Sequence, residues 1–102
     1  MRELMRGAVF LHILHHASMQ AVHGAWLSQE LARHGYDLSP GTLYPTLHRM
    51  ERDGLLVSEQ RTIEGRVLRL YRTTPAGDSA LSEGRRAVRE LADEVLPGSG
   101  HS

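Results

Sequence analysis

The segment from Leu38 to Leu56 constrains the fold most, because its pattern predicts one short helix with two chemically different faces. Leu43, Leu47 and Met50 recur at helical spacing and form an apolar stripe that must be buried. The opposite face has no acidic member and holds Gly41, Thr42, Tyr44, Pro45, His48, Arg49 and Arg52. Such a face suits a DNA groove edged by phosphates. For the segment taken alone, an ordinary solvated helix face is the simpler interpretation.

A predicted β-hairpin follows this helix and favours the DNA interpretation. Gly54 ends the helix, and residues 57–63 have the β-branched content of a strand. Glu64-Gly65 predicts a tight turn, after which residues 66–73 return as a second strand. The candidate wing cations are Arg61, Arg66 and Arg69. The alternative for these arginines is a merely solvated hairpin.

A second predicted helix precedes the amphipathic one. It opens at His23-Gly24 and runs to His34, with Leu27 and Leu31 one turn apart and Gly35 as the C-terminal stop. We expect residues 18–22 to be a connector and residues 36–38 to be a turn. The two helices together predict a helix-turn-helix. With the hairpin behind them, the order is that of a winged helix.

The start of the amphipathic helix has two interpretations. Ser39 followed by Pro40 is a strong N-cap and first-position pair, but it places Pro45 in the helix interior, where a hydrogen bond is lost. Alternatively, Thr42 is the cap and Pro45 lies within the first turn. We favour the Ser39 start with a local distortion at Pro45.

Two further predicted helices flank the winged helix-turn-helix, and both have apolar surface that must be buried. Residues 2–17 are apolar nearly all the way round, more than a domain of this size can bury alone, so we expect this helix to contact a second subunit. Thr74-Pro75 opens a long helix over residues 75–96, whose candidate pairing positions are Leu81, Leu91, Val88 and Val95. Completion of the protomer's own core is the alternative for that stripe. We favour a homodimer.

These segments predict a mainly α protein with a small β-hairpin (α+β), a winged helix-turn-helix with a C-terminal dimerisation helix. We assign residues 1–74 to the DNA-binding domain, 75–96 to the dimerisation helix and 97–102 to a flexible tail. The net charge of zero counts against simple electrostatic DNA binding. The charge is unevenly distributed, however: residues 39–72 hold six arginines against four acids, and residues 73–102 hold three against five.

The composition also excludes several kinds of site. There is no cysteine, which excludes disulfides, thiolate metal sites and thiol nucleophiles. We find no Gly-rich phosphate loop, no His-Glu-x-x-His motif and no serine elbow, so we do not expect an enzyme. The first residues lack a long apolar run, so we expect no signal peptide or membrane span and a cytoplasmic location.

Seven histidines in so short a chain raise the hypothesis of a metal site, which would make a DNA-binding regulator metal-responsive. His12 and His16 lie one helical turn apart, the spacing by which one helix offers two imidazoles to Zn²⁺, Ni²⁺ or Cd²⁺. A third ligand would come from Glu30, from His23 or from the other subunit. The alternative is that these histidines form hydrogen bonds at the rim of a dimer interface, and we favour it. No cofactor is required by any pattern in the sequence.

A small organic molecule is the alternative to a metal ion as the effector. The natural place for it is between the first and last helices at the dimer interface, with Met5, Phe10 and Trp26 as candidate lining residues. Apolar and aromatic residues at helical spacing are more often core. A winged helix used as a protein-interaction module is the non-DNA alternative, and the positive surplus of the helix and hairpin disfavours it.

The chain resembles the PadR family of transcriptional regulators, specifically its short members with a single C-terminal helix. The stretches that carry this resemblance are His23-Gly24, residues 39–47 (SPGTLYPTL), residues 51–56 (ERDGLL) and residues 71–77 (YRTTPAG). The run from Gly41 to Leu47 is the most specific. Ala25-Trp26 departs from the family pattern, which usually has an aromatic directly after the glycine.

The resemblance implies a homodimeric winged-helix repressor that binds a near-palindromic operator in double-stranded DNA and is released by a small effector or similar cue. It implies that the helix residues at the DNA are Ser39, Thr42, Tyr44, Pro45, His48 and Arg49. Side-chain chemistry favours His48 and Arg49 for base edges, and Ser39, Thr42 and Tyr44 for phosphate.

Overall fold

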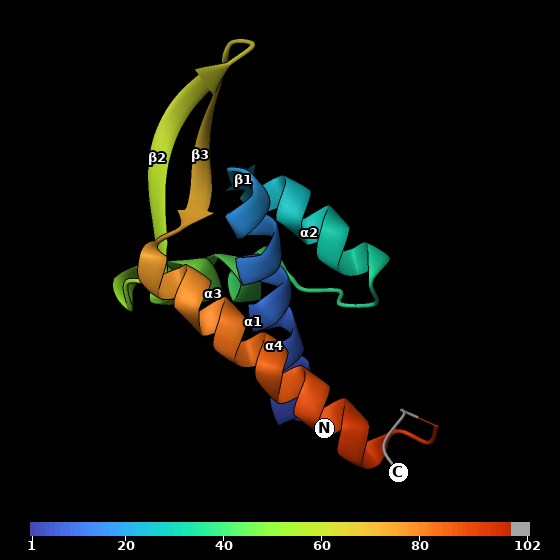
Figure 1. The fold of residues 1–102 in the computed structure, drawn as a ribbon. Coiled ribbons are helices and arrows are strands. Elements are labelled where there is room, and N and C mark those ends of the chain that lie inside the picture. The colour runs from blue at the N-terminus through green and yellow to red at the C-terminus, as the bar shows by residue number, and fades with distance from the viewer. Residues whose placement is uncertain (99–102) are drawn as a thin grey trace.

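The computed structural model describes residues 1–98, which form helices and one antiparallel sheet (Figure 1). The elements in chain order are α1 (Arg2–Met19), β1 (Val22–His23), α2 (Gly24–Arg33), α3 (Pro40–Arg52), β2 (Leu56–Ile63), β3 (Arg66–Thr73) and α4 (Pro75–Val95). The β2–β3 hairpin projects from the helical body as a wing. The predicted α+β winged helix-turn-helix is therefore confirmed.

The sheet contains one strand that sequence analysis missed. Residues 18–22 were expected to be a connector, but α1 continues to Met19, and Val22-His23 pairs antiparallel with Tyr71 and Leu70, giving the order β1-β3-β2. Two residues are too few to show the alternation that identifies a strand. This pairing fixes the base of the wing to the start of α2.

The wing has the predicted turn. Glu64 and Gly65 both have positive φ, at 51° and 77°, as a two-residue hairpin loop of the primed type requires. The flanking register pairs Ile63 with Arg66 directly beside the loop. Sequence analysis was therefore correct about the loop and both strands, apart from a start at Leu56 in place of residue 57.

Helix α3 begins as the favoured interpretation predicts. Ser39 is the N-cap, Pro40 is the first helical residue and Pro45 lies inside the helix. Pro45 has no N–H to donate to the carbonyl of Gly41, which is the local loss expected of an interior proline. At the next residue, the Thr46 hydroxyl donates to the Thr42 carbonyl at 2.8 Å.

The core lies between α1, the helix-turn-helix and the base of the sheet. The predicted stripe of Leu43, Leu47 and Met50 is buried, and so are Leu27 and Leu31 of α2. The larger buried set is completed by Val9, Ile13, Leu14, Ala17, Val22, Leu56, Tyr71 and Leu81. Within the described residues, no helix is long and apolar enough to cross a membrane.

Helices α1 and α4 lie against each other (Figure 1). Each keeps exposed apolar side chains. Leu81 is only 4% exposed and belongs to the protomer's own core, as the alternative interpretation proposed. The rest of the α4 stripe is not buried: Val88, Leu91 and Val95 are 52%, 45% and 58% exposed. On α1, the exposed large apolar side chains include Leu4 and Met5.

The ends of these helices differ slightly from the expected bounds. Helix α1 extends two residues beyond the predicted end at residue 17, and α4 ends at Val95, with Leu96 as its C-cap. Of the tail predicted over residues 97–102, residues 99–102 lie outside the described part of the chain.

Candidate functional site

The predicted DNA-binding residues lie on two neighbouring elements and are all exposed. Six belong to α3 or its cap, namely Ser39, Thr42, Tyr44, Pro45, His48 and Arg49. Three belong to the wing, namely Arg61, Arg66 and Arg69. The first turn of α3 has no acidic residue, and its last turn is basic. The local charge is therefore positive, which favours contact with the phosphates of DNA.

The exposed face of α3 has two flanks with different neighbours. On one flank, the Tyr44 ring lies against the start of α2, so close that a Cβ built on Gly24 would be 2.5 Å from the ring Cε1 atom. On the other, Thr42, Pro45 and Arg49 border a hollow of about 940 Å³ shared with the first half of α1. Within residues 1–98, no hydrogen bond or ion pair holds the Arg49 guanidinium, which is therefore available to a ligand.

The close approach at Gly24 gives a first prediction. Gly24→Ala is expected to displace the Tyr44 ring, which is 40% exposed and free to rotate away, so stability should change little. If Tyr44 donates to a phosphate, operator binding should weaken by about 1 kcal/mol, roughly fivefold. Fluorescence anisotropy measures the affinity, and thermal melting checks the fold. In a Tyr44→Ala background, Gly24→Ala should have no further effect; an undiminished effect there would contradict this explanation.

The wing arginines differ in their partners. Arg61 Nε lies 3.2 Å from Glu59 Oε1, an exposed pair that screens its charge only weakly. Arg69 Nη1 donates to Ser58 Oγ at 3.0 Å, and that hydroxyl donates to Glu51 Oε2 at 2.8 Å. Arg69 is thus tied to the end of α3.

Arg66 stands next to the hairpin loop, and within residues 1–98 its side chain takes part in no hydrogen bond or ion pair. Sequence analysis grouped the three arginines as equivalent wing cations. The hydrogen bonds that link Arg69 through Ser58 to Glu51 distinguish Arg69 from the other two arginines. They join residues up to 18 positions apart, so no local sequence pattern indicates them.

The two predicted metal-ligating histidines come together with a third that sequence analysis missed. His12, His16 and His34 each offer a ligand atom, and these atoms lie within 4.8 Å of one another. His34 is the C-cap of α2, and its approach to α1 depends on the packing of the two helices, which the sequence does not encode locally. His23, named as a candidate third ligand, instead caps α2: its Nδ1 accepts from the Trp26 N–H at 3.4 Å.

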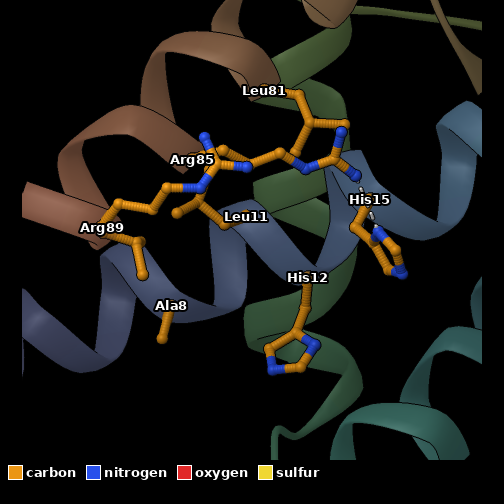
Figure 2. A pocket seen from close by; sticks show the side chains of 8 residues that line it. Ala8, Leu11, His12, His15, Leu81, Arg85 and Arg89 are labelled. Carbon is orange, nitrogen blue, oxygen red and sulfur yellow. Dashed lines mark hydrogen bonds between the residues drawn. The ribbon is translucent and has the colours of Figure 1, made fainter. Parts of the chain in front are cut away.

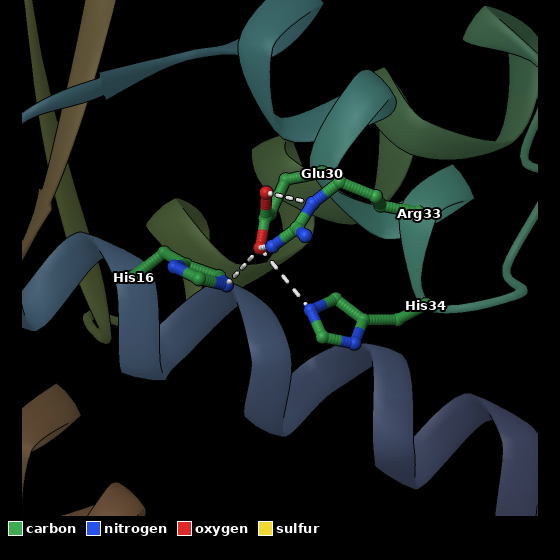
Figure 3. A network of polar contacts seen from close by, with 4 residues as sticks. All are labelled: His16, Glu30, Arg33 and His34. Atoms are coloured by element: carbon green, nitrogen blue, oxygen red, sulfur yellow. Dashed lines mark hydrogen bonds and ion pairs between the residues drawn. The ribbon is translucent and has the colours of Figure 1, made fainter.

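Glu30 lies at the edge of this histidine cluster, defined here as His12, His16 and His34. Figure 3 shows Glu30 between His16 and His34. Its Oε2 is 3.6 Å from His16 Nε2 and 3.1 Å from His34 Nε2, while Arg33 donates to both carboxylate oxygens. The hydrogen bonds from Arg33 and from His34, that from Arg33 first, lower the Glu30 pKa to about 2. Burial lowers the pKa of His12 and of His16, which favours their neutral, metal-ligating form near neutral pH.

A smaller hollow of about 480 Å³ is lined by residues of both α1 and α4, beside their contact (Figure 2). Leu11, Leu81 and Val88 give it an apolar wall, and Arg85 Nη2 lies 3.1 Å from His15 Nδ1 at its edge. The residues expected to line an effector site do not lie together. Met5 and Phe10 border the 940 Å³ hollow, whereas Trp26 stands edge-on to the His16 ring and borders neither space.

Comparison with known proteins identifies the family. Residues 13–83, more than half of the chain, match the transcriptional regulator PadR-like family. The chain belongs to the PadR-like family. A PadR-like chain is a transcriptional regulator that binds DNA, which agrees with the exposed helix-turn-helix and wing. The resemblance predicted from the Gly41–Leu47 run is thus confirmed.

Individual relatives agree in both sequence and fold. "Transcriptional regulator Rv3488" of Mycobacterium tuberculosis is 69% identical over 102 residues, which covers 100% of this PadR-like chain and 95% of the relative. A PadR family regulator from Eggerthella lenta is 34% identical with a TM-score of 0.79, covering 91% of this chain and 82% of its own. A PadR-like regulator from Bacillus cereus is 28% identical with a TM-score of 0.81, covering 94% of this chain and 98% of its own.

Proposed function

We propose that this PadR-like regulator is a homodimeric, sequence-specific repressor that occupies a near-palindromic operator in the cytoplasm and leaves it when an effector binds. The observation that carries the proposal is the exposed, acid-free face of α3 with the unpartnered Arg49 guanidinium beside it. Phosphate contacts position such a helix in the major groove, and base contacts specify the sequence.

Within this proposal the side chains have different roles. Arg49 and His48 contact base edges, Ser39, Thr42 and Tyr44 hydrogen-bond phosphate, and Pro45 packs at the groove. The wing arginines Arg61, Arg66 and Arg69 approach backbone or minor groove. Arg66 is the best placed of them, because its guanidinium has no competing partner in the described residues.

The dimer is supported by the uncovered apolar surface. Val88, Leu91 and Val95 continue the helical stripe that Leu81 begins, yet they are about half exposed in the single protomer. A second copy is the partner that would cover the same stripe on both chains by one symmetric contact. Two recognition helices would then read half-sites about one helical turn of DNA apart, or a multiple of it.

Operator binding provides the test of these roles. Arg49→Ala is expected to weaken binding to operator DNA by ~1 to 3 kcal/mol with a smaller effect on random DNA, because it loses a base contact. Arg66→Ala is expected to weaken binding to both DNAs alike and to lower the salt slope by about one. Both variants are titrated at several salt concentrations against the DNA upstream of the chain's own coding region and against a scrambled duplex.

Two results would refute the assignment. Unchanged affinity in both variants would remove α3 and the wing from the DNA interface and favour a protein-interaction module. A footprint with a single unpaired half-site would contradict the dimeric geometry. As a matched control we choose Arg86→Ala, since Arg86 is exposed on α4, away from the proposed DNA face.

A further inference from the structure

We propose that His12, His16 and His34, with Glu30 as a fourth ligand, bind one divalent transition-metal ion of the Zn²⁺, Ni²⁺ or Cd²⁺ class. The site would be the effector site of the regulator, and this regulatory part alone rests on the function proposed above. The chemistry of binding stands on the side chains themselves.

The geometry of the cluster is close to that of a tetrahedral site. Ligand atoms around tetrahedral Zn²⁺ stand roughly 3.4 Å apart, as Zn–N bonds of about 2.1 Å require. The three imidazoles already offer atoms within 4.8 Å of one another. His12 and His16 come from successive turns of α1, and the exposed His34 side chain can close the remaining gap by side-chain rotation.

Glu30 supplies the charge and the fourth position. The imidazole Nε2 atoms of His16 and His34 face the same carboxylate oxygen, Oε2, at 3.6 and 3.1 Å. A cation between these three atoms would replace the His34–carboxylate hydrogen bond and the longer His16–carboxylate contact with metal–ligand bonds. It would also displace the hydrogen bond that Arg33 Nη2 donates to Oε2 at 2.9 Å. Arg33 can keep Oε1 at 3.1 Å and hold the carboxylate in orientation, as outer-shell partners of metal ligands do.

The ligand set selects among metals. Three imidazoles and one carboxylate suit Zn²⁺, Ni²⁺ and related ions, whereas Cu⁺ prefers the thiolates that this chain lacks. The ligands must be deprotonated, so binding should weaken as the pH falls through the range where imidazoles gain protons. Among the surrounding groups, the Arg33 guanidinium lies closest, with Nη2 2.9 Å from Glu30 Oε2, and the His15 ring stands edge-on to the His16 ring.

Its position gives the site a means of regulation. His12 and His16 lie on α1, which carries exposed apolar surface for a partner, while Glu30 and His34 lie at the end of α2. A metal ion would join the two helices and fix the angle at which the helix-turn-helix is held. In a dimer, that angle sets the separation of the two α3 helices and hence affinity for a fixed half-site spacing.

Calorimetry on the untagged full chain tests the site directly. Zn²⁺, Ni²⁺ and Cd²⁺ are titrated into the wild type, His16→Ala, His34→Ala and the matched control His15→Ala. The His15 ring touches the His16 ring edge-on, but its Nδ1 pairs with Arg85 of α4 and it offers no ligand atom to the cluster. We expect one ion per chain in the wild type and the control. Loss of a ligand should weaken binding by at least about 100-fold, beyond the 10- to 100-fold cost of losing an outer-shell partner.

Calorimetry has two results that would overturn the metal site. No heat in the wild type, or identical heats in all four proteins, overturns the metal site and leaves a histidine cluster that only packs α1 on α2. His34 is exposed, so His34→Ala should retain the wild-type melting temperature without metal, and a folding defect cannot explain its loss of binding.

A gel shift with and without Zn²⁺ then tests regulation. We expect Zn²⁺ to change operator affinity at least about tenfold in the wild type, within the 1–3 kcal/mol typical of allosteric coupling, and not in His34→Ala. Equal shifts in both proteins would overturn the regulatory part while the site remains. Absence of DNA binding under all conditions would instead refute the proposed function and leave the calorimetric result intact.

Discussion

Replacing Leu91 with glutamate is expected to convert the protein from a dimer into a monomer and to abolish tight operator binding. Leu91 is 45% exposed in the protomer, between Val88 and Val95 on the apolar stripe of α4. Covering the exposed 45% of Leu91 contributes about 0.7–1.4 kcal/mol, and the symmetric contact loses it twice, about 1.4–2.7 kcal/mol per dimer. That alone corresponds to a roughly 10- to 100-fold weaker dimer, and burying two glutamate carboxylates weakens it further.

Analytical ultracentrifugation over a concentration series measures the dissociation constant. Arg86→Glu is the matched control, because it introduces the same side chain on the opposite side of α4 and changes the net charge by more. The control should remain dimeric. If Leu91→Glu is as dimeric as the wild type, the exposed stripe has another use and the dimer must be formed elsewhere. Circular dichroism checks that the variant remains helical.

The fold was largely predictable where periodicity and local turn chemistry carry the information. Leu43, Leu47 and Met50 marked the buried side of α3, and Glu64-Gly65 marked the hairpin loop. Strand β1 was not predictable, since two residues have no period and form a strand only because β3 lies beside them. Helical spacing correctly identified the apolar stripe of α4. It could not show that, of Leu81, Val88, Leu91 and Val95, Leu81 alone is buried within the protomer.

The DNA face and the histidine cluster differ in how far the sequence alone could predict them. The DNA face is a property of one helix and one hairpin, so the sequence places its residues on a common surface. The histidine cluster depends on how the end of α2 packs on α1. The sequence therefore identified His12 and His16 as a pair and named Glu30 only among alternatives, and it missed His34, which completes the set.

The second large effect is expected at Gly77, where α4 begins against the corner between α3 and β2. Its N–H donates to the Thr74 hydroxyl at 3.0 Å, and the Thr74 N–H donates to the Leu55 carbonyl at 3.1 Å. A Cβ on Gly77 would overlap that same carbonyl oxygen. The obstacle is backbone and cannot rotate away, so Gly77→Ala must displace the start of α4.

Overpacking of this kind costs about 1–3 kcal/mol, and each kcal/mol lowers the melting temperature of a domain of this size by roughly 4–8 °C. Thermal melting therefore should show a fall of roughly 4–24 °C for Gly77→Ala. Gly41→Ala makes the same chemical change in the first turn of α3, where the new Cβ meets only Ser39 Oγ at 3.7 Å. That control should be neutral, or stabilising by up to about 1 kcal/mol, because alanine restricts the unfolded chain. Equal melting temperatures for Gly77→Ala and the wild type would mean that the corner can open without cost, and that Gly77 is not what fixes α4 to the DNA-binding unit.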